Sequence, residues 1–225
     1  SRAAFRCLTA SGLQARLALP WEAAAGAYDR VVLALPAGRG TAYVQASLVA
    51  AARALRMGGR LYLAGDKNKG FERYFKEARA LLGYGVVVRR EGPYRVALLE
   101  KEKEAPPLPS LWRAFSARIL GAEYTFHHLP GVFSAGKVDP ASLLEALQER
   151  LGPEGVRGRQ VLDLGAGYGA LTLPLARMGA EVVGVEDDLA SVLSLQKGLE
   201  ANALKAQALH SDVDEALTEE ARFDI

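Results

Sequence analysis

The chain is poor in several residue types, and each absence excludes a class of protein or site. Cys7 is the only cysteine among 225 residues, so no disulfide can form within the chain and no cysteine metal cluster is possible. His127 and His128 stand together without a metal-ligand spacing, and we predict no metal site. No run of eighteen apolar residues occurs, and the opening SRAAFRCLTA lacks the apolar stretch of a signal peptide. These absences predict a soluble, cytoplasmic protein.

Negative charge is scarce in one half of the chain. Residues 1–105 contain 18 Lys and Arg against nine Asp and Glu, whereas residues 106–225 contain ten against 17. Such a basic half predicts contact with a polyanion, and a solvated basic surface without a partner is the alternative. Half of all residues are apolar, so a packed core is expected throughout.

Strand and helix patterns alternate along the chain. Before the charged, proline-containing linker EKEKEAPPLPS (100–110), strands are expected at 31–35, 60–65, 84–90 and 94–101, with helices at 41–59 and 71–83. This alternation, closed by a hairpin, predicts a mainly parallel sheet. After the linker, helices are expected at 136–155 (capped by Asp139, with Pro140 first), 170–179 and 189–203, and strands at 159–165, 180–186 and 205–212.

An internal repeat relates the two halves. Residues 7–32 resemble residues 198–225, with Leu13 matched to Leu204 and Asp29 to Asp224. Chance similarity between two helices rich in Ala and Leu is the alternative, but the order of elements also matches. The repeat predicts a slice through two tandem α/β domains. The first domain contributes its back half in 1–105, a lead-in follows in 106–128, and the second domain contributes its front half in 129–225.

The stretch VLDLGAGYGA (161–170) places Gly165, Gly167 and Gly169 between a strand and a helix. Bare glycines expose backbone N–H groups to a ligand at a helix N-terminus. One interpretation, G-x-G-x-x-A, is the dinucleotide pattern with a pyrophosphate ligand. The other, D-x-G-x-G-x-G, also uses Asp163. A carboxylate is a poor neighbour for pyrophosphate, and it favours a ligand with an ammonium and a sulfonium, such as S-adenosylmethionine.

Acidic residues follow the next two strands. Glu186 ends one of them, where a carboxylate can accept both ribose hydroxyls of a nucleoside. Asp212 follows the other, where it can accept an adenine amine. A turn or helix cap leading into VDEAL is the alternative for Asp212. Ligands of open α/β sheets bind at this edge, so the two acids and the glycine turn predict one nucleoside site.

Two segments carry a family resemblance. VLDLGAGYGALTLPLARMGAEVVGVEDD (161–188) resembles the first motifs of class I methyltransferases. LPGVFSAGKVDPASLLEAL (129–147) resembles the entry segment of bacterial small-subunit ribosomal RNA guanine-N2 methyltransferases. That family has two tandem methyltransferase-like domains, of which the second is catalytic. The resemblance implies an α/β chain with two tandem Rossmann-like domains, each partly present, and a degenerate first domain.

The resemblance also implies an activity and a site. The activity is transfer of a methyl group from S-adenosylmethionine to the exocyclic N2 amine of a guanine in ribosomal RNA. The partner is ribosomal RNA or the small ribosomal subunit, and the protein is expected to be a monomer. The cofactor-binding residues that the resemblance implies are Phe133, Asp163, Gly165, Ala166, Gly167, Gly169, Glu186, Asp187, Asp212 and Val213. For Phe133, a role as a core anchor in a loop is the alternative.

The family's catalytic Asn-Pro-Pro-Phe motif would begin just after Ile225, so no catalytic residue is expected in this chain. In the first domain the equivalent stretch is Ala34-Leu35-Pro36-Ala37, which has neither an amide acceptor nor a stacking ring. The first domain should therefore not be a methyltransferase. Its charge instead predicts RNA contact, with ordinary solvated cations as the alternative; the expected RNA-binding residues, all in loops after strands, are Arg39, Lys67 and Lys69.

Two other functions fit part of the pattern. A methyltransferase of the same fold could act on a large-subunit RNA guanine or on a protein glutamine. A nicotinamide-dependent oxidoreductase or a noncatalytic nucleotide-binding module would also use a glycine turn and Glu186. Asp163, supported by Asp212, favours the methyltransferase.

Overall fold

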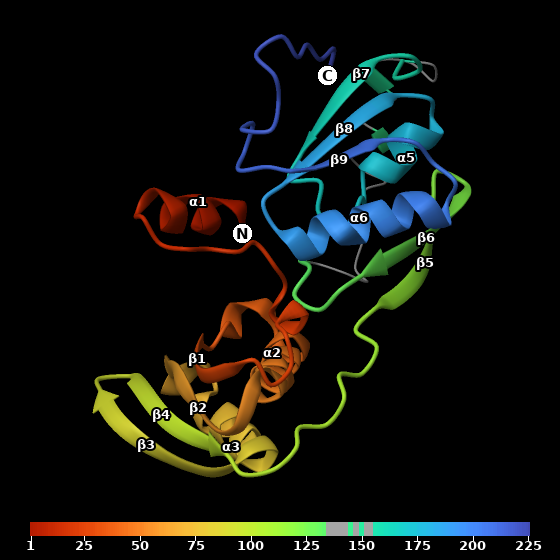
Figure 1. Cartoon of the computed structure of the whole chain (residues 1–225). Coiled ribbons are helices and arrows are strands. Elements are labelled where there is room, and N and C mark those ends of the chain that lie inside the picture. The colour runs from red at the N-terminus through yellow and green to blue at the C-terminus, as the bar shows by residue number, and fades with distance from the viewer. Residues whose placement is uncertain (134–143, 146–148, 151–154) are drawn as a thin grey trace. The chain divides into compact units, whose positions relative to one another are not determined.

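The computed structural model describes residues 1–133, 144–145, 149–150 and 155–225. It divides the chain into two compact units (Figure 1). Residues Ala18–Leu111 form one, called here the basic unit. Ser1–Leu17 and Trp112–Ile225 together form the other, called here the glycine-turn unit. Most of the helix predicted at 136–155, including Asp139 and Pro140, lies outside the described residues.

The basic unit is a four-stranded sheet with order β1-β2-β4-β3. Its helices α2 and α3 contact each other and cover one face of this sheet. The apolar side chains of the strands and helices meet in one core that includes Val44, Leu48, Leu61, Leu63, Phe71 and Leu99. The elements are β1 (Tyr28–Ala34), η2 (Ala37–Arg39), α2 (Thr41–Ala54), β2 (Leu55–Asp66), η3 (Lys67–Lys69), α3 (Phe71–Leu82), β3 (Gly83–Glu91) and β4 (Tyr94–Lys101), preceded by η1 (Pro20–Glu22).

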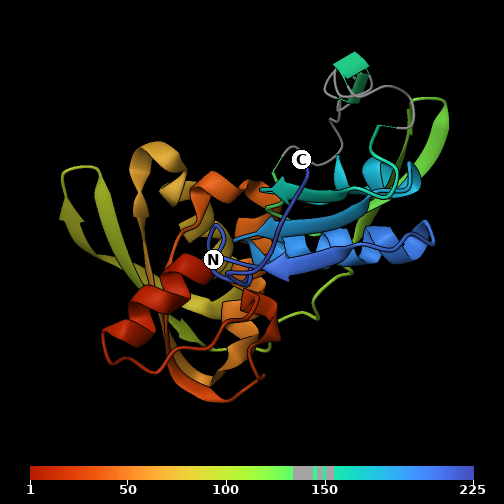
Figure 2. The same ribbon diagram turned by 90° about the horizontal axis from the view of Figure 1, so that it is seen from above.

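The prediction of a mainly parallel sheet is wrong for the basic unit. Only β1 and β2 pair in parallel, while β4 pairs antiparallel with both β2 and β3. The chain turns back after β3 in a tight hairpin, and β4 lies between β2 and β3 in the sheet. Figure 2 shows this hairpin from above, extending past the rest of its sheet. Local patterns identify the strands, but strand insertion depends on contacts that are distant in sequence.

The helix predicted at 41–59 ends earlier, at Ala54. Leu55 already pairs with Tyr28, and the β1–β2 register then shifts before Arg30 meets Arg60. Gly58, with φ of +71°, lies in this irregular part of β2. The glycine pair therefore belongs to a strand irregularity and is not the helix stop that the sequence suggests.

The glycine-turn unit contains a parallel sheet of order β7-β8-β9. Gly184 in β8 faces Thr172 of α5 and Leu195 of α6, so both helices lie on the same side of that sheet. A β5–β6 hairpin packs on α6, where Asn202 exchanges hydrogen bonds with the backbone of Thr125. The elements are α1 (Arg2–Ala10), β5 (Arg113–Ile119), β6 (Ala122–His128), β7 (Gln160–Leu164), α5 (Thr172–Arg177), β8 (Glu181–Glu186), α6 (Leu189–Ala201) and β9 (Gln207–His210).

The compact units begin and end at other residues than the predicted domains. Residues 1–17 pack in the glycine-turn unit because α1 bonds to Asp187, and the predicted lead-in at 106–128 contains the β5–β6 hairpin of the same unit. Assignment of the halves to a degenerate and a catalytic domain stays a prediction. On the side of β7 away from β8, Leu162 N–H donates to Ile225 O at 3.0 Å. The end of the second repeat therefore lies along β7.

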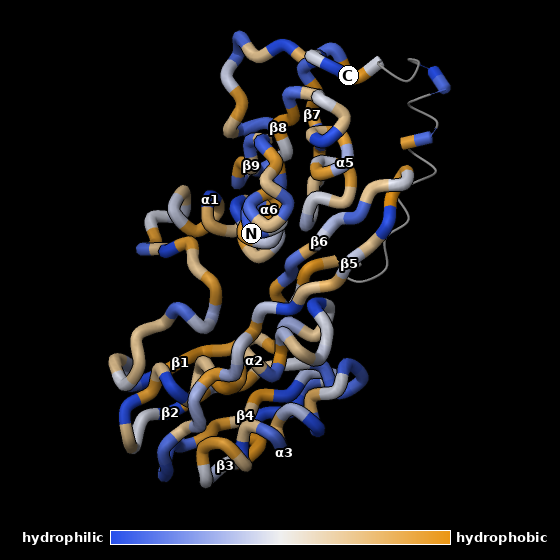
Figure 3. The backbone as a smooth tube through the Cα atoms, turned by 90° about the vertical axis from the view of Figure 1, so that its right-hand side faces the viewer, coloured by the Kyte–Doolittle hydropathy of each residue, from blue (hydrophilic) through white to orange (hydrophobic). Residues whose placement is uncertain are grey.

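Hydrophobic stretches, drawn in orange, occur along strands and helices of both units (Figure 3). Among the described residues, no helix is long and apolar enough to cross a membrane. In the same residues, no cluster of three or more His, Cys, Asp or Glu side chains is arranged to hold a metal ion.

Candidate cofactor site at the glycine turn

The turn between β7 and α5 is hydrogen-bonded to β8 on one side and unobstructed on the other. Gly165 N–H and Ala166 N–H both donate to Val185 O of β8, at 2.9 and 3.1 Å. Gly165 and Gly167 have φ of +75° and +56°, a region that side chains disfavour. A Cβ at Gly165 would meet no atom within 4 Å, and one at Gly167 would meet only Gly165 O, at 3.9 Å. This side of the turn is therefore accessible to a ligand.

Gly169 serves packing instead. With φ of +95°, it lies where a Cβ would fall 2.6 Å from Leu195 Cδ1 and closer still to Leu173. Gly184 in β8 has a similar role, since its Cβ would lie 3.0 Å from Ala166 Cβ. The sequence did not single out Gly184, because a glycine inside a strand has no motif that reveals what packs above it.

Asp163 is buried beneath the turn, with 8% of its surface exposed. Its Oδ2 accepts a hydrogen bond of 2.6 Å from the Thr172 hydroxyl, which belongs to the first residue of α5. Burial raises the pKa of Asp163, the hydrogen bonds from Thr172 oppose this, and the nearby charge of Glu186 adds to it. The carboxyl group thus links the end of β7 to the start of α5, through a partner that sequence reasoning missed.

Glu186 connects the turn to the next strand end. Its Oε2 accepts from Gly167 N–H and its Oε1 from Asp188 N–H, both at 3.0 Å. Each carboxylate oxygen can accept more than one hydrogen bond, so both remain able to accept a ribose hydroxyl. The structure thus brings Asp163, Glu186 and the glycine turn together, as the sequence predicted.

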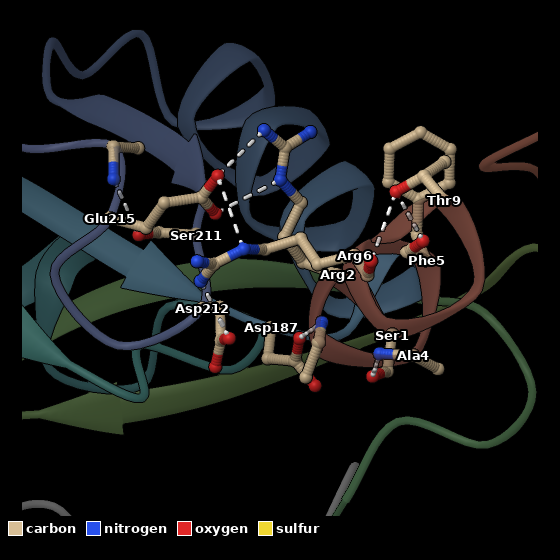
Figure 4. A network of polar contacts seen from close by, with 12 residues as sticks. Ser1, Arg2, Ala4, Phe5, Arg6, Thr9, Asp187, Ser211, Asp212 and Glu215 are labelled. Carbon is tan, nitrogen blue, oxygen red and sulfur yellow. Dashed lines mark hydrogen bonds and ion pairs between the residues drawn. The ribbon is translucent and has the colours of Figure 1, made fainter. Parts of the chain in front are cut away.

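The other acids at this edge contact helix α1 (Figure 4). Arg6 Nη1 lies 2.9 Å from Asp212 Oδ2, and Ala3 N–H donates to Asp187 Oδ1 at 2.8 Å. Arg2 forms two hydrogen bonds of 3.1 Å with Glu215. Sequence reasoning missed α1 as a neighbour of the site, since about 200 residues separate these partners and no local signal links them.

The residues after β9 form turns in the structure. The Ser211 hydroxyl accepts from Ala216 N–H, so Ser211 holds this segment while the Asp212 side chain pairs with Arg6. No helix forms in VDEAL, so the helix-cap alternative for Asp212 is wrong. A turn does begin at Asp212, since its backbone O accepts from Glu215 N–H at 3.2 Å. Val213 is exposed and has φ of +57°, which is unusual for a β-branched residue.

Phe133 is 88% exposed, so the alternative that it anchors the core is wrong. Leu129 and Val132 are the buried residues of this segment. Leu129 N–H donates to the Ser194 hydroxyl of α6 at 3.2 Å. A cofactor contact of Phe133 stays a prediction, as do the cofactor contacts of the other predicted residues.

Tyr168 anchors the turn to the β5–β6 hairpin. It stands between two of the turn's glycines and is 4% exposed, with its ring edge-on to Phe126 at 5.6 Å between centroids. Phe115 completes the cluster, at 5.9 Å from Tyr168. Burial raises the pKa of the Tyr168 hydroxyl. The sequence interpretation treated this position as a spacer, although its ring fixes the turn from the protein side.

The predicted RNA-binding residues of the basic unit fall into two groups. Lys67 and Lys69 are exposed in η3, directly after β2. Arg39 is half-buried in η2, after β1, and its guanidinium carbon lies 4.3 Å from the centroid of the Tyr43 ring. All three follow carboxyl ends of strands, and the half-burial of Arg39 on Tyr43 differs from the alternative of an ordinary solvated cation.

Known proteins are similar to this chain in sequence and in fold. The family model described as "Methyltransferase small domain" matches residues 123–225. The ribosomal RNA small subunit methyltransferase C of Stutzerimonas stutzeri is 34% identical over 195 residues, which cover 83% of this chain and 55% of that protein. The protein of the same name from Chromohalobacter salexigens is 36% identical over 74% of this chain and 49% of its own length. The chain thus spans about half the length of these curated relatives.

A solved structure extends the likeness to the whole chain. It is a 16S rRNA guanine-N2 methyltransferase from T. thermophilus, in complex with AdoMet and guanosine. The match has 99% sequence identity and a TM-score of 0.98, and it covers 100% of this chain and 61% of that one. The present chain therefore has the α/β fold of class I methyltransferases and belongs to the ribosomal RNA small subunit methyltransferase C family.

Proposed function

We propose that the protein transfers a methyl group from S-adenosylmethionine to the exocyclic N2 amine of a guanine in small-subunit ribosomal RNA. The observation that carries the proposal is the glycine turn, open at Gly165 and Gly167 and closed beneath by Asp163 and Glu186. The nearly identical T. thermophilus protein, described with AdoMet and guanosine, supports the same assignment.

The residues around the turn fit this cofactor. The space where Cβ atoms would stand at Gly165 and Gly167 lets a ligand approach the backbone closely. Glu186 would hold the ribose hydroxyls, and Asp212 the adenine amine through Oδ1, since Arg6 bonds to its Oδ2. Asp163 would favour the positively charged end of the ligand. S-adenosylmethionine, when bound, supplies an electrophilic methyl group on its sulfonium.

The contribution of this chain to the reaction is positioning. Asp163, Glu186 and Tyr168 tie the turn to α5, to β8 and to the β5–β6 hairpin, so that the turn needs little reorganisation when a ligand binds. Holding two reactants in line can lower a barrier substantially, with effective molarities of about 10⁵ M or more. We assign no catalytic residue among those described. The guanine would be unpaired or flipped out of its helix, because its amine is otherwise inaccessible.

The basic unit would bind the RNA, through Lys67, Lys69 and the half-buried Arg39. Residues 18–111 contain 15 Lys and Arg against nine Asp and Glu. Lysines at the carboxyl ends of strands can neutralise RNA phosphates, which makes affinity dependent on salt. A ribosomal RNA substrate places the protein in the cytoplasm. That it acts as a monomer stays a prediction.

Calorimetry on the protein at the full length of its curated relatives tests the cofactor assignment. S-adenosylmethionine should bind and NAD should not, because the buried carboxyl of Asp163 disfavours a pyrophosphate. The Asp163→Asn variant separates a cofactor role from mere stability, since Asn has a similar size and can still accept from Thr172. Binding of NAD without a response to S-adenosylmethionine would show an oxidoreductase or nucleotide-binding module instead.

Salt titrations of RNA binding test the docking assignment. Replacing Lys67 and Lys69 together by Ala should reduce the slope of log affinity against log salt by about 1.4, or about 0.7 per phosphate contact with a single strand. Lys76 and Arg79 on α3 are also exposed, and their double Ala variant is the matched control. An unchanged slope for the first variant would refute RNA docking through η3.

A further inference from the structure

A cavity of about 290 Å³ lies in the basic unit, at the carboxyl ends of the parallel strands β1 and β2. Small or apolar residues form most of its lining: Ala34, Leu35, Ala37, Ala64 and Gly65. Ligands of open α/β sheets bind at this edge. The volume is just below the range of about 300–1,000 Å³ that is typical of sites for drug-sized ligands, so it suits one planar base better than a dinucleotide.

Tyr94 gives this cavity an aromatic wall. It is the first residue of β4, opposite Asp66 at the end of β2, and 63% of its surface is exposed. Lys67 N–H donates to Pro93 O at 2.9 Å and thereby ties η3 to the β3–β4 turn beside Tyr94. An exposed ring at the mouth of a small cavity is a stacking platform for an unpaired base.

Charged side chains of both signs complete the lining. Lys69 lines the cavity, and Lys67 stands exposed two residues before it. Asp66 also lines it, and its Oδ1 is held by Asn68 N–H at 2.8 Å. The fixed carboxylate offers an acceptor for the amino or imino group of a base, while the lysines suit a phosphate.

We propose that this cavity binds one unpaired nucleotide of an RNA strand, with the base stacked on Tyr94 and a neighbouring phosphate on Lys69. The inference rests on the proposed function, because it takes RNA as the partner. The excess of Lys and Arg in residues 18–111 favours a polyanion over a free nucleoside. The stretch Ala34–Ala37 has no amide side chain to aim an amine, so the cavity serves binding and not methyl transfer.

The test uses the chain and a single-stranded RNA octamer that carries one 2-aminopurine, whose fluorescence reports stacking. The chain should bind the octamer and change this fluorescence. Tyr94→Ala should weaken binding about 5- to 150-fold, as expected for the loss of one stacked base, and abolish the fluorescence change. Tyr94→Phe, which keeps the ring, should retain both. Tyr94→Ala should leave the salt slope unchanged, whereas Lys69→Ala should reduce it by about 0.7.

Tyr84 provides the matched control, because it is 48% exposed on the same sheet but lies opposite Glu100, at the other end of β4. Tyr84→Ala should bind RNA like the unmodified chain. Ala37→Leu offers a second route, since it fills the cavity from η2 and leaves Tyr94 in place. It should also weaken binding, which keeps the proposal testable if Tyr94→Ala proves unstable in thermal melts.

The outcomes separate this inference from the proposed function. Salt-dependent RNA binding that neither Tyr94→Ala nor Ala37→Leu changes would overturn the cavity assignment and leave RNA docking intact. Equal losses in Tyr84→Ala and Tyr94→Ala would also overturn it. Guanosine monophosphate that binds as tightly as the octamer would overturn the choice of RNA as occupant. Methyl transfer to ribosomal RNA is measured separately, so its failure is distinguishable from all of these.

Discussion

The hydroxyl of Thr172 donates a hydrogen bond of 2.6 Å to Asp163 Oδ2 and so joins the end of β7 to the start of α5 beneath the open glycine turn. Both residues are buried, so the bond is shielded from competition by water. The carboxyl group therefore has a structural role and a predicted ligand-binding role at once. Variants that separate these two roles are the most informative ones.

Asp163→Asn should weaken S-adenosylmethionine binding about tenfold or more, because a charged partner of the ligand is lost. Its effect on stability should depend on pH. The pKa of Asp163 is raised by burial, so the folded state holds this proton above the ordinary carboxyl pKa of about 3.9, where the unfolded state has released it. The free energy of unfolding of the unmodified protein minus that of Asp163→Asn should decrease as pH rises from about 4 through the raised pKa of Asp163. Above that pKa the difference should stay constant.

Denaturant titrations of both proteins between pH 4 and pH 8 measure this difference. Asp214→Asn, at an exposed aspartate of the same glycine-turn unit, controls for the general effect of removing a carboxyl group. A difference that rises with pH would show that the pKa of Asp163 is lowered in the folded state.

The glycines of the turn should respond differently to alanine. Gly169→Ala should lower the free energy of unfolding by about 2–5 kcal/mol, since the left-handed backbone costs about 1–2 kcal/mol and the clash with Leu195 and Leu173 adds about 1–3 kcal/mol. Gly165→Ala should cost only the backbone part, because its Cβ meets open space. Thermal or denaturant unfolding distinguishes the two.

Cofactor binding should rank these variants in the reverse order. At a temperature where both remain folded, Gly165→Ala should impair S-adenosylmethionine binding more, because its methyl group occupies the ligand side of the turn. Equal binding by Gly165→Ala and the unmodified protein would place the ligand elsewhere.

Glu186→Gln should weaken both the turn and the ligand site. Glu186 accepts backbone N–H groups through both oxygens, whereas glutamine has one acceptor and would present an NH₂ group to the other donor. An unsatisfied donor costs about 1–3 kcal/mol, so unfolding should shift by that amount. Calorimetry should show a parallel loss of S-adenosylmethionine affinity. Wild-type affinity in this variant would remove Glu186 from the ribose-binding role.

Arg6→Gln should change stability by less than about 1 kcal/mol, because the Arg6–Asp212 pair is partly exposed and screened by salt. It should weaken S-adenosylmethionine binding about 2- to 5-fold, since Asp212 loses the contact that orients its carboxylate. Arg222, whose guanidinium donates to the nearby backbone carbonyls of Glu219 and Ala221, gives the control variant Arg222→Gln. Tighter binding of S-adenosylmethionine by Arg6→Gln than by the unmodified protein would mean that α1 competes with the ligand.

Local sequence patterns suffice for features that depend on residues close together in the chain. Apolar periodicity located strands β1 to β4 and β7 to β9 and helices α2, α3, α5 and α6, because burial of one face is a short-range property of an amphipathic segment. It did not identify the β5–β6 hairpin, which lies in the predicted lead-in at 106–128. The positions of Asp163 and Glu186 relative to the glycine turn followed as well, because adjacent parallel strands bring their carboxyl ends to one edge. Helix α2 was predicted too long, because the strand pairing of Leu55 prevails over its helical pattern.

The sequence by itself determined that residues 161–186 form a strand, an open turn, a helix and a second strand with an acid at its end, since each step depends on neighbours in the chain. Tertiary structure alone decided the insertion of β4, the exposure of Phe133, the cavity beside Tyr94 and the pairing of Arg6 with Asp212 across 206 positions. These features arise from packing between segments that are distant in sequence, and no local propensity encodes which distant surface a segment meets.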